Sequence, residues 1–217
     1  MINDPLKSSV LSMRLIPNVS ADMLGQLKLP SGHRSIGLFT ADCDDVAYTA
    51  MDEATKKADV KVVYGRSFYG GAANANTKLA GEVLGIISGP SPAEVSSGLD
   101  AICSFIASEA FFISANEDDT ISYFAYCVSR TGSYLSEIAG IAEGDPLAYL
   151  IAPPLEAVYG LDAALKAADV KIAAFYGPPS ETNFGGGLLT GTQSACSAAC
   201  EAFASAVKSI ASNPCEY

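Results

Sequence analysis

The chain has 217 residues, 49% of them apolar and 17% charged, and its 24 acidic and 13 basic residues give a net charge of −11. This balance excludes a nucleic-acid-binding protein, which needs clustered lysines and arginines, and no run approaches the roughly 18 apolar residues of a membrane span. The first residues lack the basic and apolar regions of a signal peptide, so we expect a cytoplasmic protein with no membrane partner.

The first half of the chain alternates strands with helices. The last helix of this half has clear start signals, because Ser91 is a good N-cap and Pro92 suits the first turn. In chain order we expect a buried strand at 35–40, an alanine-rich helix at about 50–58, a strand at 60–62, a loop rich in glycine and asparagine at 65–78, a strand at 82–87 and a helix at 92–107.

The second half repeats this order. Residues 51–62 and 161–172 align at an offset of 110, and seven of their positions are identical. In chain order we expect a strand at 147–151, a helix at about 160–168, a strand at 170–172, a loop at 177–187, a strand at 187–190 and a helix at 193–211. The chain is therefore two copies of one module, and alternating strands and helices predict an α/β sandwich.

The cysteines and the histidine carry little catalytic signal. The six cysteines contain no C-x-x-C pair, so neither a zinc knuckle nor a thioredoxin-type motif is predicted. Cys196 and Cys200 lie one helical turn apart and have the spacing to share a metal, but we interpret them as small packing residues. His33 is the only histidine, which excludes a two-histidine metal site within one chain.

Several stretches resemble the bacterial microcompartment shell domain: Ser35 to Phe39, the helix end at 166–171, the Tyr-Gly that follows it, and the glycine-flanked strand before the small-residue helix. Residues 9–17 resemble the strand that ordinarily closes this domain, yet here they open the chain, and 121–129 take the equivalent place before the second copy. This is the pattern of a tandem, circularly permuted shell protein. Further stretches resemble the L-type shell proteins of ethanolamine utilisation: 28–30, 44–46, 63–67, 128–135, 152–157 and 178–183.

The resemblance implies a fold and an assembly. The fold is an α/β (α+β sandwich) chain of two permuted shell domains, residues 1–113 and 114–217. The assembly is a homotrimer of pseudo-sixfold shape that joins other microcompartment shell proteins edge to edge. Lys56 and Lys166 match a lysine at the tile edge of this family, although a solvated lysine that favours the C-terminal helix dipole would look the same.

The resemblance also implies a gated central pore. Two glycine- and asparagine-rich loops occupy equivalent places in the two copies, and such loops surround the symmetry axis in this family. Their alternative interpretation is a pair of plain surface turns. The residues expected at the pore are Arg66, Ser67, Phe68, Tyr69, Gly70 and Asn74 in the first loop and Asn183, Phe184 and Gly185 in the second.

A pocket for ethanolamine is the last implication. Ethanolamine carries an ammonium and a hydroxyl, so its site needs carboxylates, an aromatic face and a polar group. The positions that match such a site in L-type shell proteins are Asp44, Asp45, Glu82, Phe111, Phe112, Thr182 and Asn183. Singly, the aspartates also suit helix capping and the phenylalanines suit the core. Whether cobalamin binds is left open by the sequence.

An enzyme is not predicted. A cysteine or serine nucleophile needs an activating base, and one histidine beside Arg34 is a poor candidate. The acidic residues Asp42, Asp44 and Asp45 lack the spacing and glycine of an EF-hand loop, so they are a weak signal for a cation. We expect no cofactor and no metal. The alternative to a shell protein is a small-molecule-binding regulatory protein, which would share the pocket but would not form tiles.

Overall fold

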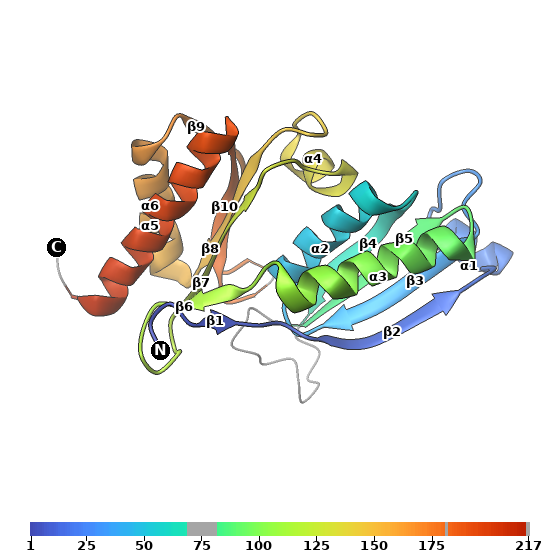
Figure 1. The fold of residues 1–217 in the computed structure, drawn as a ribbon, viewed down its shortest axis with the longest axis horizontal. Coiled ribbons are helices and arrows are strands. Elements are labelled where there is room, and N and C mark those ends of the chain that lie inside the picture. Colours follow the sequence, from blue (N-terminus) through green and yellow to red (C-terminus); the bar gives the residue numbers. More distant parts are fainter. Residues whose placement is uncertain (69–81, 181, 216–217) are drawn as a thin grey trace. The chain divides into compact units, whose positions relative to one another are not determined.

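The computed structural model describes residues 1–68, 82–180 and 182–215 and divides the chain into two compact units (Figure 1). Unit 1 comprises 1–6, 111–131 and 136–217, and unit 2 comprises 7–110 and 132–135. The fold is a mixed α/β fold with a sheet and two long helices in each unit, as expected. The domain boundary after residue 113 stays a prediction.

The sheet of unit 2 has four antiparallel strands in the order β2-β3-β5-β4. The strands are β2 (Val10–Ile16), β3 (Ser35–Ala41), β4 (Lys61–Phe68) and β5 (Glu82–Gly89). Along β3, side chains alternate between the two faces. Phe39 lies on the helix face, because a Cβ added at its β5 partner Gly85 would meet both the Phe39 ring and the sulfur of Met51, which belongs to the helix at 44–57. Ile36 belongs to a second apolar cluster with Val19 and Leu24.

Two helices cover the sheet of unit 2, α2 (Asp44–Lys57) and α3 (Pro92–Ser108). The start of α3 is confirmed, because the Ser91 hydroxyl accepts a hydrogen bond from the Glu94 N–H at 3.3 Å. The predicted start of α2 at residue 50 was wrong by nearly two turns. The first turn holds two aspartates, a residue type common at helix N-termini, and the first buried apolar residue of the helix, Val46, follows them directly.

The sheet of unit 1 has six antiparallel strands in the order β1-β6-β7-β8-β10-β9. The strands are β1 (Pro5–Leu6), β6 (Phe112–Ser114), β7 (Ser122–Val128), β8 (Leu147–Ala152), β9 (Val170–Tyr176) and β10 (Gly185–Gly191). The sequence did not predict β1 and β6, because both are too short to show a period. In β10, Gly186 has φ of +154°, and a Cβ there would lie 1.9 Å from the Leu150 carbonyl oxygen.

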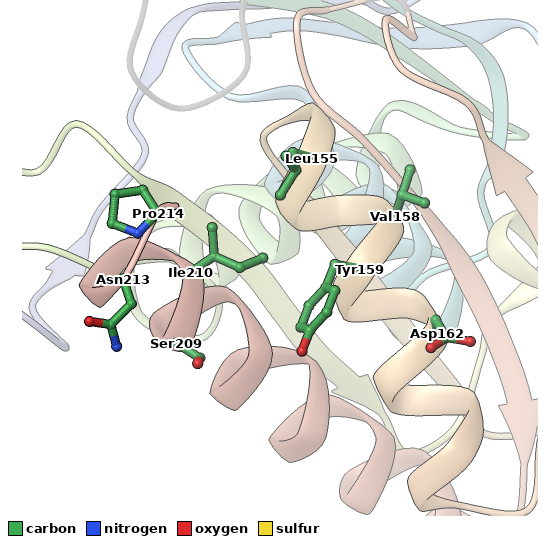
Figure 2. A pocket seen from close by; sticks show the side chains of 8 residues that line it. All are labelled: Leu155, Val158, Tyr159, Asp162, Ser209, Ile210, Asn213 and Pro214. Atoms are coloured by element: carbon green, nitrogen blue, oxygen red, sulfur yellow. The ribbon is translucent and has the colours of Figure 1, made fainter. Parts of the chain in front are cut away.

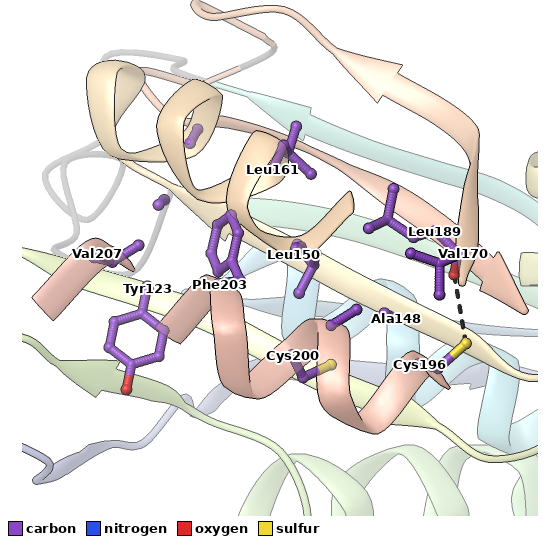
Figure 3. Close-up of a cluster of buried hydrophobic side chains, with 14 of the residues drawn as sticks. Tyr123, Ala148, Leu150, Leu161, Val170, Leu189, Cys196, Cys200, Phe203 and Val207 are labelled. Atoms are coloured by element: carbon purple, nitrogen blue, oxygen red, sulfur yellow. Dashed lines mark hydrogen bonds between the residues drawn. The ribbon is translucent and has the colours of Figure 1, made fainter. Parts of the chain in front are cut away.

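Helices α5 (Pro154–Ala167) and α6 (Gln193–Ser212) pack against this sheet and enclose the core of unit 1 (Figure 3). Phe203 fills its centre and approaches Gly160 so closely that a Cβ there would lie 2.7 Å from the ring. Cys196 and Cys200 are buried in the same cluster, and the Cys196 thiol donates to the Leu189 carbonyl oxygen at 3.8 Å. Burial raises the pKa of both thiols, as expected for packing residues.

Two short helices, α1 (Ala21–Gln26) and α4 (Ser133–Ala139), were not predicted from the sequence. They are equivalent at an offset of 112. A left-handed residue ends each of them, Lys28 with φ of +51° and Gly140 with φ of +63°, and a second follows, Gly32 at +88° and Gly144 at +96°. The first turn of α4 belongs to unit 2 and the rest to unit 1.

Within the described part of the chain, the longest helices are too short or too polar to cross a membrane.

Candidate functional site

Three of the predicted ligand residues are buried carboxylates of unit 2. Asp44 and Asp45 begin α2, and Glu82 begins β5. The Ser67 hydroxyl, on β4, donates a hydrogen bond to the Asp44 carboxylate. The next residue of β4 pairs with Glu82 in the sheet register. Asp44 is therefore hydrogen-bonded to the strand that runs beside the start of β5.

The electrostatics of these carboxylates are unfavourable in the chain alone. Burial, and then the neighbouring charge of Asp45, raise the pKa of Asp44 well above its usual value, although the Ser67 hydroxyl and the Asp45 N–H act in the opposite direction. The Glu82 Oε2 atom is buried and finds no hydrogen-bond partner in the described residues. A buried acceptor without a donor is costly. A ligand with N–H or O–H groups and a positive charge would offset this cost.

The other predicted ligand residues lie in unit 1. Phe112 is buried, stacks on Phe124 with ring centroids 5.3 Å apart, and meets Phe184 edge-on at 5.9 Å. The buried Thr182 hydroxyl accepts a hydrogen bond from the Phe184 N–H at 3.2 Å. Asn183 beside it is exposed. Phe112, Phe184 and Thr182 thus form one group in unit 1, and Phe111 is half-buried next to it.

The residues expected at the pore are only partly described. Arg66 and Ser67 lie in β4 and Phe68 ends it, while Tyr69, Gly70 and Asn74 lie outside the described residues. In the second loop, Gly185 is already the first residue of β10 and pairs with Ala152 of β8. The residues before it, Asn183 and Phe184, form the approach to that strand.

The two lysines expected at a tile edge have different surroundings. The Lys56 side chain is mostly buried and its amine pairs with Asp52 at 3.6 Å and with Glu53 at 2.5 Å. The Lys166 side chain is exposed and its amine pairs with Asp162 at 2.6 Å. Lys166 is therefore the better placed of the two to reach a neighbouring molecule.

The weak enzyme candidates have structural roles. His33 Nδ1 lies 2.9 Å from the Ser88 hydroxyl, but Ser88 is fully buried and cannot meet a substrate. Asp42 accepts hydrogen bonds from the Ser8 hydroxyl and the Ser9 N–H. Among the described residues, no three histidine, cysteine or acidic side chains are grouped to hold a metal ion.

Comparison with known proteins agrees with this picture. The BMC domain family matches residues 35–116. The bacterial microcompartment shell protein EutL of Clostridium perfringens is 66% identical over 214 residues, covering 99% of this chain and 99% of the relative. The crystal structure of the ethanolamine utilization protein EutL from Leptotrichia buccalis matches with a TM-score of 0.95 and 72% identity, covering both chains completely.

The chain belongs to the EutL family of bacterial microcompartment shell proteins.

EutL proteins are structural shell proteins, so the absence of catalytic machinery expected from the sequence agrees with the family, and the shell role is favoured over a regulatory one. The fold is shared more widely. The trimeric bacterial microcompartment shell protein PduB is only 20% identical, yet it matches with a TM-score of 0.75 over 94% of this chain and 89% of that chain.

Sequence reasoning missed one group that the structure brings together. Asp52 is fully buried and accepts hydrogen bonds from the Gly132 N–H at 2.7 Å and the Leu135 N–H at 2.9 Å. The sequence did hold one indication of Asp52, because the residue is repeated: Asp162 has the same place in the second copy, again four residues before a lysine.

Proposed function

We propose that this chain forms homotrimeric, pseudo-hexagonal tiles in the shell of an ethanolamine-utilising microcompartment, binds ethanolamine, and carries a gated central pore. The observation that carries the proposal is the repetition of one unit, a sheet with two long helices, within a single chain. Cyclic assembly of three such chains gives six similar units around one axis. The names of the relatives support the shell context and the pathway.

Ethanolamine binding is supported by the carboxylates of unit 2. An ammonium group would neutralise the charge that Asp44 and Asp45 place close together, and its N–H groups would supply donors to Glu82 Oε2, which has none among the described residues. Phe111, Phe112, Thr182 and Asn183, which lie in unit 1, carry the aromatic, hydroxyl and amide groups that suit ethanolamine chemically.

Gating is supported by the position of Thr182. It lies in the loop before β10, in which Thr182 and Ser180 form local hydrogen bonds. A ligand that contacts such a loop in one of two conformations favours that conformation by its differential affinity. Ethanolamine would in this way stabilise one state of the pore.

Calorimetry tests the ligand. Ethanolamine should release or absorb heat on binding the wild-type protein at millimolar ligand, and Asp45→Ala and Glu82→Gln should each weaken binding. Asp59→Ala is the matched control, because this aspartate is exposed just beyond α2. Absence of heat with the wild-type protein would refute ethanolamine binding.

Light scattering followed by electron microscopy tests the assembly. We expect a trimer in solution and hexagonally packed sheets at high concentration. A stable monomer at micromolar concentration would refute the trimer, and trimers that never form sheets under any shell-forming condition would refute the tile.

A further inference from the structure

Ser67 is not among the residues expected to bind ethanolamine, yet its hydroxyl donates a hydrogen bond to the Asp44 carboxylate at the start of α2. The resemblance implied a place for Ser67 at the pore. In the structure it is a residue of strand β4 and pairs with Val83 of β5, which follows Glu82 directly. Ser67 thus connects the helix that carries two of the expected ligand carboxylates with the pair of strands that carries the third.

Both oxygens of the Asp44 carboxylate are held in this arrangement. Oδ2 accepts the hydrogen bond from the Ser67 hydroxyl, and Oδ1 accepts one from the Asp45 N–H at 2.9 Å. The Asp45 bond is local to the first turn of α2, whereas the Ser67 bond comes from the sheet and fixes the carboxylate relative to β4. An ionised carboxylate has about four acceptor positions, so both oxygens can still accept hydrogen bonds from a ligand.

The Ser67 hydroxyl also stabilises the charge of Asp44. Burial, and then the charge of Asp45, raise the pKa of Asp44, whereas the hydrogen bond from Ser67 lowers it. A hydrogen bond donated to a carboxylate favours its charged form, and the charged form is the one that attracts an ammonium group. Loss of the Ser67 donor would therefore change both the orientation and the charge of Asp44.

The second copy of the module shows that the fold does not require these buried carboxylates. Helices α2 and α5 both have 14 residues and align at an offset of 110, so that Asp44 and Asp45 correspond to Pro154 and Leu155. Asp45 is 7% exposed, whereas Leu155 is 62% exposed and lies at a groove of about 900 Å³ lined by α5 and the end of α6 (Figure 2). A buried aspartate in place of an exposed leucine reverses the usual distribution of polar and apolar side chains. Burying a carboxylate is costly, so this reversal indicates a ligand site in unit 2.

We propose that Ser67 is a positioning residue of the ethanolamine site and acts on the ligand through Asp44. This inference rests on the proposed binding of ethanolamine. The Ser67 hydroxyl orients the Asp44 carboxylate from the side of the sheet, and Asp44 presents its remaining acceptor positions to the ammonium group. Ser67 itself makes no contact with the ligand.

Calorimetric titration with ethanolamine tests this role. Ser67→Ala removes the donor and should weaken binding by about tenfold, as expected for the loss of a hydrogen bond to a charged group. Ser67→Thr keeps the hydroxyl and should bind ethanolamine as tightly as the wild type. Ser12→Ala is the matched control, because the Ser12 hydroxyl lies 2.7 Å from the Thr40 hydroxyl in the same sheet, on a strand that carries no expected ligand residue.

A double-mutant cycle separates action through Asp44 from a direct contact with the ligand. If Ser67 acts through Asp44, the variant with both Ser67→Ala and Asp44→Asn should bind ethanolamine as weakly as Asp44→Asn alone. A double variant that binds clearly more weakly than Asp44→Asn would show an independent effect of Ser67 and would overturn the positioning role. Far-ultraviolet circular dichroism and light scattering should be unchanged in every variant, so that a loss of affinity is not a loss of fold.

Failure of this inference can be distinguished from failure of the proposed function. A Ser67→Ala variant that binds ethanolamine as tightly as the wild type would refute the role of Ser67 and leave the ligand site in place. A Ser67→Thr variant as weak as Ser67→Ala would also refute it, because the hydroxyl would then not be the group that matters. A wild-type protein that gives no heat with ethanolamine would instead refute the binding site itself.

Discussion

Asp52 stabilises unit 2 from a fully buried position, and its removal gives a sharp test of the packing described above. Asp52→Ala leaves the N–H groups of Gly132 and Leu135 without acceptors. It also removes a carboxylate partner of the Lys56 amine, which keeps its ion pair with Glu53. We expect the variant to fold but to be clearly less stable than the wild type.

The magnitude follows from two opposing effects. A buried donor without an acceptor costs about 1–3 kcal/mol, so two of them cost about 2–6 kcal/mol. Burial of the carboxylate raises the pKa of Asp52, against the effect of its two N–H donors and Lys56, so its removal also relieves a desolvation cost. We therefore expect Asp52→Ala to lose about 2–3 kcal/mol of unfolding free energy, the lower part of that range. Asp52→Asn should have a stability between those of the wild type and Asp52→Ala, because its amide oxygen can accept one of the two hydrogen bonds.

Urea unfolding followed by circular dichroism measures this loss of unfolding free energy. In thermal unfolding, the substitution should lower Tm by about 2–4 °C for each kcal/mol lost in a chain of this size. Asp169→Ala is the control, since Asp169 is exposed after α5. Equal stability of Asp52→Ala and the control, within about 0.5 kcal/mol, would refute the role assigned to the buried carboxylate.

Four further outcomes are expected. Because burial raises the pKa of Asp44, ethanolamine binding should release a proton and tighten as pH rises through that raised pKa; calorimetry in buffers of different ionisation heat measures this, and pH-independent binding would contradict it. The same carboxyl holds its proton more tightly in the folded chain, so its contribution to stability is present below the unfolded pKa of about 3.9 and is lost as pH rises; Asp44→Asn should flatten this dependence in urea unfolding. Lys166→Glu should prevent sheets in electron micrographs and leave the trimer intact in light scattering, and normal sheets would exclude an edge role. The Cys200 thiol, whose pKa is raised by burial, should react with iodoacetamide only after denaturation, whereas the exposed Cys215 should react in the folded protein; mass spectrometry distinguishes the two.

Core packing in unit 1 offers a last check. Phe203→Ala should destabilise the protein by about 3–5 kcal/mol, because the fully buried ring would leave a cavity in the cluster. Phe203→Leu should cost less because it leaves a smaller cavity. Chemical unfolding measures both, and equal costs would contradict the packing seen around Gly160.

Local signals in the sequence predicted the regular elements. The repeat at 51–62 and 161–172, the apolar runs of β3 and β8, and the capping residues Ser91 and Pro92 act over short distances, so each could be recognised without a fold. Helices α1 and α4 and strands β1 and β6 are too short to show a period. They depend on neighbours elsewhere in the chain, and the sequence therefore did not reveal them.

For the candidate site, too, the sequence predicted one part and only the structure decided the other. Its residues were named from resemblance, and their chemistry could be read from their types. Only the tertiary structure decided that Asp44, Asp45 and Glu82 are all buried, and that one Glu82 oxygen has no partner among the described residues. Burial depends on what packs over a side chain, and those groups come from distant strands.

Asp52 and Asp162 illustrate this limit most directly. Both stand in nearly the same local sequence, on equivalent helices, four residues before a lysine. The sequence by itself determined that the two helices are alike. The tertiary structure decided that one aspartate is buried and the other exposed, because residues 132–135, 80 or more positions along the chain, pack over the first and supply its hydrogen bonds.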